Sequence, residues 1–207
     1  MAVQHADPRP QRRDAVRNHQ LVVDAAREVL SEFGTDASME HIASRAGVGV
    51  GTVYRRFPNK EALIDELVRL ILDELVTAAE SELARGEGSG LDAFLRVLGR
   101  SLSEHRGYAD KLVGRTKAAC AARLRARIAE LLAQAQRLGR VREDITLGDV
   151  MATIYGLRGI VAATGEAAPD AWERHLDIHL AGFRSPTAPS GRPSLTPDDL
   201  ARITAGG

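Results

Sequence analysis

Apolar residues recur every three to four positions along most of the chain, which is the spacing of one face of an α-helix. The first such face is formed by Leu21, Val22, Ala25, Ala26, Val29, Leu30 and Phe33. No convincing stretch shows the alternation of apolar and polar positions that is typical of a strand. The pattern therefore predicts an all-α fold.

Glycine and small polar residues divide the N-terminal part of the chain into short helices. Gly34 follows the first apolar face, where a helix end favours the left-handed conformation. Ser38 is a typical N-cap for the next helix, and Glu40 places a carboxylate in its first turn, where the helix dipole favours negative charge. Gly47 ends this helix, and a third short helix is expected over 49–56.

Longer helices are expected after a break at Pro58 and Asn59. The longest amphipathic pattern runs over 60–83, and the Gly-rich residues 85–90 are expected to form a flexible connector. Further helical patterns occupy 91–106, 108–113, 117–138, 147–164 and 169–183.

Two short helices joined at Gly47 and followed by a long helix are the pattern of a helix-turn-helix. The stretch from Arg45 to Lys60 also contains Arg55 and Arg56 and has no acidic residue. The whole chain is neutral, with 28 Lys and Arg against 28 Asp and Glu, so nucleic-acid binding requires a local patch of this kind. Basic side chains beside the amides of a helix N-terminus suit contact with phosphates.

The residues around this turn form a dense motif. Residues 39–63 read MEHIASRAGVGVGTVYRRFPNKEAL, which combines Ile-Ala, Ala-Gly-Val, Thr-x-Tyr, Phe and Lys-x-x-Leu. This stretch resembles the DNA-binding domain of the TetR family of bacterial transcriptional regulators, and the resemblance begins near Leu21. Residues 135–144 are similar to a segment in the C-terminal regions of some members.

The resemblance implies a sequence-specific regulator, most often a repressor, that binds an inverted-repeat operator in double-stranded DNA as a homodimer and responds to a small-molecule effector. Residues 14–58 would form the helix-turn-helix domain, and 59–184 the helical regulatory and dimerisation domain. Residues 1–13 and 185–207 are polar or rich in proline, which predicts a disordered arm and a disordered tail. Insertion of the basic arm into a minor groove is the alternative for its arginines.

The resemblance also assigns roles to single residues. Thr52 and Tyr54 would stand on the recognition helix and contact phosphates or base edges. Lys60 would meet a backbone phosphate, and Arg55 and Arg56 would reach either a base edge or the backbone. Ser38 would offer its hydroxyl or amide to a phosphate at the start of the preceding helix.

Three positions of the recognition helix lack polar side chains. Gly49 stands where the family commonly has Ser, and Val50 and Gly51 follow it. They limit base readout to apolar contact, for instance with a thymine methyl group. The expected DNA interface therefore comprises Ser38, Gly49, Val50, Gly51, Thr52, Tyr54, Arg55, Arg56 and Lys60.

The C-terminal half offers candidates for an effector pocket and a dimer contact. Apolar and adaptable side chains suit a pocket between helices, and the candidates are Phe94, Tyr108, Met151 and Tyr155. Packing in the core explains each of them equally well. In the resembling family the last two long helices form the homodimer; in this chain these helices are 147–164 and 169–183. The apolar stripe Trp172, Leu176, Leu180 and Phe183 is expected to meet the partner subunit because no later helix is predicted to cover it.

Two clusters have alternative interpretations. His175 and His179 lie four residues apart on one helix face, as two metal ligands would, but packing or a subunit contact is the favoured interpretation. Residues 111–142 hold nine Lys and Arg against the single acid Glu130. This run favours a solvated face paired with acids elsewhere over a second anion-binding surface.

The remaining features argue for a cytoplasmic protein that is not an enzyme. Cys120 has no base and orienting group nearby in the sequence, and no Gly-rich phosphate loop follows a strand. No cofactor, metal or membrane partner is therefore expected, since no apolar run approaches the length of a membrane span either. One alternative function stays open: a helical module that senses a metal or a partner without specific DNA contact.

Overall fold

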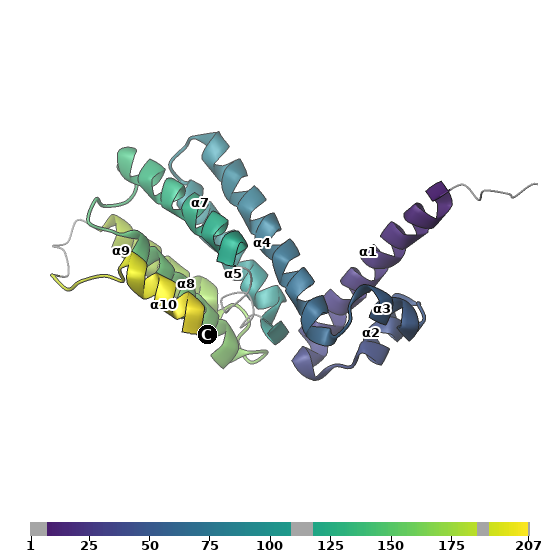
Figure 1. The fold of residues 1–207 in the computed structure, drawn as a ribbon. Coiled ribbons are helices and arrows are strands. Elements are labelled where there is room, and N and C mark those ends of the chain that lie inside the picture. Colours follow the sequence, from purple (N-terminus) through teal and green to yellow (C-terminus); the bar gives the residue numbers. More distant parts are fainter. Residues whose placement is uncertain (1–7, 109–117, 186–190, 207) are drawn as a thin grey trace, which may run out of the picture. The chain divides into compact units, whose positions relative to one another are not determined.

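The computed structural model describes residues 8–108, 118–185 and 191–206, with side chains for 16–108, 119–185 and 191–203. The chain divides into two compact units, Met1–Leu67 and Val68–Gly207. The described residues form helices and no strand, which confirms the all-α prediction (Figure 1). No described helix is long and apolar enough to cross a membrane.

The first unit is a small helical domain, and α1 and α2 supply part of its core. Its elements are α1 (Pro8–Phe33), the 3-10 turn η1 (Gly34–Asp36), α2 (Met39–Ala46), α3 (Val50–Arg56) and the beginning of α4 (Lys60–Arg85). The apolar face of α1 is buried at Val22, Val23, Ala26, Val29 and Leu30, and Ile42 of α2 is fully buried.

The predicted caps set the path of the chain around α2. The Ser38 hydroxyl accepts a hydrogen bond from the amide of His41 at 3.1 Å, which satisfies one of the free amides at the start of the helix. Gly47 adopts φ 66°, the left-handed conformation that ends α2 and turns the chain into α3. Asn59 caps α4, because its side-chain oxygen accepts from the amide of Ala62 at 2.8 Å.

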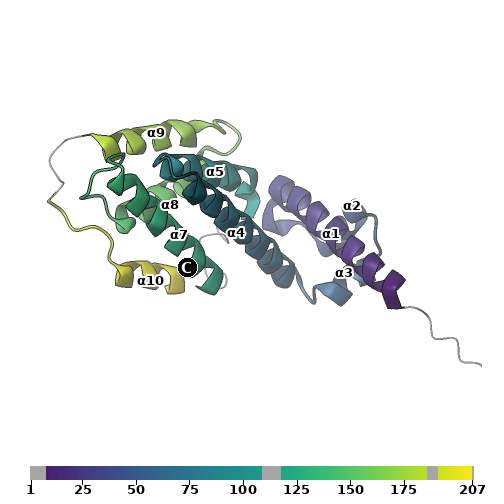
Figure 2. The ribbon, with the colours of Figure 1, turned by 90° about the horizontal axis from the view of Figure 1, so that it is seen from above.

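The second unit is a bundle of longer helices (Figure 2). After the rest of α4 come α5 (Gly90–Glu104), the turn η2 (Arg106–Tyr108), α7 (Ala118–Arg137), α8 (Leu147–Thr164), α9 (Ala171–Arg184) and α10 (Pro197–Gly206). Helix α8 begins with a capping box, in which Thr146 and Asp149 satisfy each other's amides. The predicted helix over 147–164 agrees with α8, whereas most of the predicted helix over 108–113 lies outside the described residues.

The structure corrects the predictions at both chain ends. Residues 8–13 of the expected disordered arm are helical, and Pro8 stands at the first position of α1, where proline is compatible with a helix. In the expected disordered tail, 197–206 form α10, which likewise starts at a proline, Pro197. Leu200 is buried, and the Thr196 hydroxyl donates to Asp199 at 2.7 Å. Residues 1–7, 186–190 and 207 lie outside the described residues.

The expected domain boundary after residue 58 also differs from the structure. The first unit extends to Leu67, because the beginning of α4 supplies the buried residues Leu63 and Leu67 to it. Helix α4 therefore starts in one unit and continues into the other without a break.

Candidate DNA-binding interface

Helix α3 has one face in the core and one face open to solvent. Val53 is fully buried, and Phe57 just after the helix is buried as well. On the other sides of the helix, Gly51 and Arg55 are exposed, and Tyr54 is 45% exposed. The open side of α3 is therefore available to a partner.

Gly49, Val50 and Gly51, which lack polar side chains, are also exposed. Val50 is 38% exposed. A Cβ atom built on Gly49 or on Gly51 would meet no other atom within 4 Å. Ser38 is exposed as well, although its hydroxyl oxygen already serves the cap of α2.

The two arginines of α3 have different partners. Arg55 donates from its guanidinium to the Thr52 hydroxyl at 3.1 Å, a contact within α3. Arg56 donates from Nε to Nδ1 of His19 on α1 at 3.3 Å. The ring of His19 also stacks on Phe57, with ring centroids 5.7 Å apart. The role of His19 is not evident from the sequence, because no local pattern marks a partner 37 positions away.

Arg45 is held by the first helix. Its guanidinium lies 3.0 Å from Glu28 and 3.4 Å from Glu32, both on α1. The hydrogen bond to Glu28 is the main cause that raises the pKa of Arg45. Two carboxylates thus surround the first of the four basic residues in the predicted patch.

Lys60 stands at the start of α4 and forms hydrogen bonds with the connection between α1 and α2. Its ammonium donates to the carbonyl of Thr35 at 2.5 Å and to the carbonyl of Ala37 at 3.3 Å. An ammonium has three donors, so a phosphate contact is compatible with both bonds. The first unit thus contains all nine residues of the expected DNA interface.

The second unit contains a narrow cavity of about 70 Å³ between α4, α5, α7 and α8. Of the four predicted pocket residues, Met151 and Tyr155 line it. Phe94 and Tyr108 are buried but do not line it. The lining is mainly leucine and isoleucine, with Ser101 and Arg125 as polar members that the sequence did not indicate.

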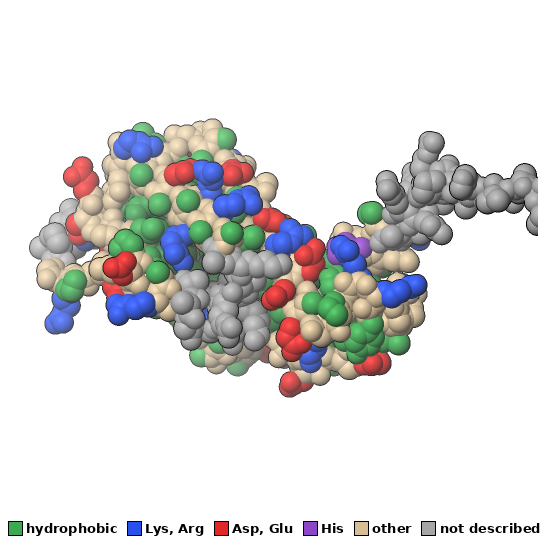
Figure 3. All heavy atoms as spheres, in the orientation of Figure 1, with side chains coloured by type: hydrophobic (Ala, Val, Ile, Leu, Met, Phe, Trp, Pro, Cys, Tyr) green, Lys and Arg blue, Asp and Glu red, His purple; other side chains and the backbone are tan. Residues whose placement is uncertain are grey.

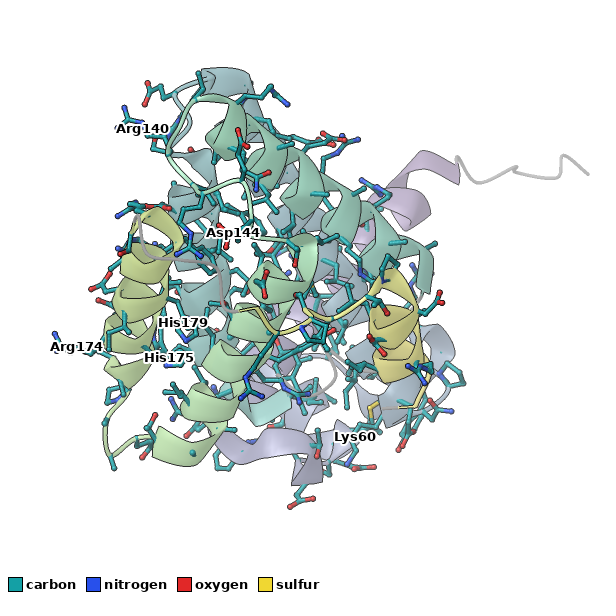
Figure 4. The ribbon with its side chains drawn as sticks, turned by 90° about the vertical axis from the view of Figure 1, so that its left-hand side faces the viewer. Lys60, Arg140, Asp144, Arg174, His175 and His179 are labelled. Atoms are coloured by element: carbon teal, nitrogen blue, oxygen red, sulfur yellow. The ribbon has the colours of Figure 1, made fainter. Side chains whose placement is uncertain are left out.

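The histidines of α9 lie between α9 and α8. Figure 4 shows His175 and His179 on the side of α9 that faces α8, whereas Arg174 points away. Their ring centroids are 4.4 Å apart, and Nδ1 of His179 lies 3.3 Å from the hydroxyl of Thr153 on α8. Burial, and then the neighbouring His175, lower the pKa of His179. Among the described residues, no group of three or more His, Cys, Asp or Glu side chains is placed to hold a metal ion.

The apolar stripe of α9 is part of the core of the second unit, so its predicted role as a dimer contact is wrong. Trp172, Leu176, Leu180 and Phe183 are all buried within the chain. The Trp172 ring lies directly against Gly99 of α5, where even a Cβ atom would approach it to 2.3 Å. On the opposite side of α9, Ile178 is 58% exposed.

Three arginines of the basic run over 111–142 are paired with acids. The pairs are Arg123 with Asp73 at 3.4 Å, Arg127 with Glu130 at 2.6 Å and Arg142 with Asp144 at 2.7 Å. Lys and Arg side chains alternate with Asp and Glu over the surface in view in Figure 3. Lys111, Arg115 and Lys117 lie outside the described residues.

Known families match both units. The family model "Bacterial regulatory proteins, tetR family" matches residues 22–67, which include α2 and α3. The model "Transcriptional regulator SbtR-like, C-terminal domain" matches residues 88–185.

Similar proteins agree with these matches. A TetR transcription regulatory protein from Mycobacterium vanbaalenii is 33% identical, with 85% of this chain and 100% of that chain covered and a TM-score of 0.64. The TetR transcriptional regulator SCO0520 from Streptomyces coelicolor is 32% identical, with 81% and 99% covered and a TM-score of 0.63.

The HTH-type transcriptional regulator YhgD from Bacillus subtilis is 34% identical over 70 residues, which are 33% of this chain and 37% of that protein. The chain thus spans only about a third of the length of such curated relatives. The matches to both units and the full-length structural relatives show that the chain belongs to the TetR family, whose members are DNA-binding transcription regulators and not enzymes.

Proposed function

We propose that this protein is a ligand-responsive repressor that acts in the cytoplasm and binds an inverted-repeat operator as a homodimer. The observation that carries the proposal is the open side of α3, which presents Tyr54 and Arg55 to solvent while Val53 is buried. A recognition helix of a helix-turn-helix enters the major groove with such a side.

The DNA contacts divide into two kinds. Ser38 at the start of α2 and Lys60 at the start of α4 are suited to phosphates, since one offers a hydroxyl and a helix start and the other an ammonium. Gly49, Val50, Gly51, Thr52, Tyr54 and Arg55 form the surface that enters the groove, and Arg56 borders this surface. Basic residues on this surface supply a local positive charge to a chain whose net charge is zero.

Dimerisation through α8 and α9 places two recognition helices on one operator. One α3 reads one half-site, so useful affinity requires two chains. The exposed residues of α8 include Ala152, Gly159 and Ala163, which allow close approach of another helix. Ile178 adds an exposed apolar side chain on α9. These residues replace the buried stripe of α9 as the proposed contact with the partner subunit.

The effector binds in the cavity of the second unit in this proposal. An apolar lining with Ser101, Arg125 and Tyr155 suits a small, partly apolar molecule. Typical ligand pockets measure about 300–1,000 Å³, whereas this cavity measures about 70 Å³. Ligand binding therefore requires lining side chains to move.

Helix α4 is the proposed link between effector and DNA. It begins at Lys60 and supplies Leu72 and Leu75 to the cavity lining. A ligand weakens DNA binding only if it binds the conformation that does not bind DNA more tightly, and a 100-fold effect requires about 2.7 kcal/mol of coupling.

Selection of bound duplexes from a random pool tests the DNA-binding part, and an inverted repeat is the expected product. A ligand found by thermal-shift screening is then titrated with and without this operator. Since coupling is reciprocal, the operator should lower the ligand affinity by the same factor by which the ligand lowers operator affinity. Equal ligand affinity in both titrations would contradict the ligand-responsive part and leave the DNA-binding part intact.

A further inference from the structure

Arg55 and Arg56 are adjacent in sequence but lie on different sides of α3. Successive side chains on an α-helix are about 100° apart, so Arg55 lies roughly 160° from the buried Val53 and Arg56 only about 60° from it. Arg55 thus projects from the open side of the helix, while Arg56, which is exposed as well, lies closer to the side that packs on the rest of the unit.

The Thr52 hydroxyl holds the Arg55 side chain. The contact of 3.1 Å joins two residues one turn apart on the same helix. A flexible arginine loses conformational freedom when it binds a base, and a contact that orients it beforehand reduces that loss. Thr52 therefore acts on Arg55 as a positioning residue.

The position one turn before Arg55 is open. A Cβ atom on Gly51 would meet nothing within 4 Å, and the backbone there is not in the left-handed region. Neither packing nor backbone geometry requires glycine inside this helix, where glycine is unfavourable relative to alanine. The open space lies on the same side of α3 as the guanidinium of Arg55 and lets a partner approach the backbone closely.

Arg56 is tied to the first helix instead. Its Nε donates to His19 Nδ1 at 3.3 Å, and the imidazole stacks on the buried Phe57. On its other side, Nε2 of His19 lies 3.8 Å from Glu66 of α4. His19 therefore connects the end of α3 to both α1 and α4.

We propose that the two arginines have different tasks: Arg55, oriented by Thr52 and projecting beside the open Gly51, reads one guanine in each half-site, whereas Arg56 anchors α3 through His19 and carries no base preference. A planar guanidinium pairs with both O6 and N7 of guanine in the major groove, and this is the commonest specific contact of arginine. The inference rests on the proposed binding of an operator.

Parallel selections from one random-sequence duplex pool test this division. The proteins are the wild type, Arg55→Ala, Arg56→Ala, Thr52→Ala and Thr52→Ser. We expect Arg55→Ala and Thr52→Ala to lose the preference for guanine at the same position of each half-site, with discrimination there reduced roughly 10- to 100-fold for Arg55→Ala. Thr52→Ser keeps the hydroxyl and should keep the preference, and Arg56→Ala should select the wild-type sequence.

Thermal unfolding of each variant separates loss of reading from loss of folding. If Arg55→Ala and Thr52→Ala are folded and select the unchanged wild-type sequence, the inference is wrong. It is also wrong if folded Arg56→Ala loses the preference at one base position. A wild type that enriches no sequence would instead overturn the proposed operator binding itself.

Discussion

Helices α3 and α9 both have a covered side and an open side, but their sequences reveal these sides to different degrees. Within α3 a single residue, Val53, is buried, and the polar and glycine residues around it mark the open side. The core of α9 is a full apolar stripe from Trp172 to Phe183, and its open side carries Ile178 among charged residues.

This difference shows which features can be recognised from the sequence alone. An apolar stripe at helical spacing indicates that the stripe is buried, but the spacing is the same whether the chain's own core or a partner subunit buries it. On α9 the cover is the chain itself, in part through α5, where Trp172 lies on Gly99. On α3 the apolar side is too short to suggest a subunit contact. The motif and the geometry therefore indicate the same open side of α3.

The largest expected effect distinguishes the buried side of α9 from its exposed side. We expect Leu176→Asp to lower the free energy of unfolding by more than about 3 kcal/mol, because it places a carboxylate in a fully buried position. We expect Ile178→Asp to leave the fold intact and to shift the proposed dimer to monomer. Denaturant unfolding and sedimentation measure the two effects.

The matched pair also tests the corrected assignment. Ile178→Ala serves as the control, since removing an exposed side chain should change stability within about 0.5 kcal/mol. A folded, monomeric Leu176→Asp would restore the stripe as a dimer contact. A dimeric Ile178→Asp would remove Ile178 from the proposed interface.

The next effect concerns the open side of α3. Arg55→Ala should weaken operator binding by about 1–3 kcal/mol. Lys60→Ala should weaken binding to all sequences alike and reduce the slope of log affinity against log salt by about one, as loss of a phosphate contact does. Titrations of selected and unrelated duplexes at several salt concentrations measure both.

Arg45→Ala is the control for these basic residues. Arg45 is similarly charged but is held by Glu28 and Glu32, so its removal should change operator affinity less than either of the other two. Operator affinity equal to wild type in both Arg55→Ala and Lys60→Ala would argue against this surface.

A smaller effect separates stability from binding at Gly51. Alanine is favoured over glycine inside a helix by up to about 1 kcal/mol, and the new methyl group meets no atom of the chain. We therefore expect Gly51→Ala to raise the unfolding temperature and to weaken operator binding, because the methyl group occupies the space open to DNA. A variant that is more stable and binds as well as the wild type would show that DNA does not approach this point.

Local signals predicted the first unit well. The Ser38 cap and the left-handed Gly47 depend on residues within a few positions, so the sequence shows them directly. The bond from Arg56 to His19 depends on how α1 packs, and no local pattern encodes it. In the tail, the prolines suggested disorder, but Pro197 begins a helix that Leu200 anchors through burial.

The smallest expected effect concerns His179, which lies on the side of α9 that faces α8. Its pKa is lowered by burial and by His175, so the folded chain favours the neutral imidazole. Below the ordinary histidine pKa of about 6.5, the unfolded chain binds more protons, and stability should therefore fall as the pH falls. We expect a lower unfolding temperature at about pH 5.5 than at about pH 7.5, and a smaller difference in His179→Gln. His175→Gln removes one of the two causes and should also reduce the difference. If both variants keep the full pH dependence of the wild type, the acid sensitivity arises elsewhere, and the contact of α9 with α8 does not depend on this histidine pair.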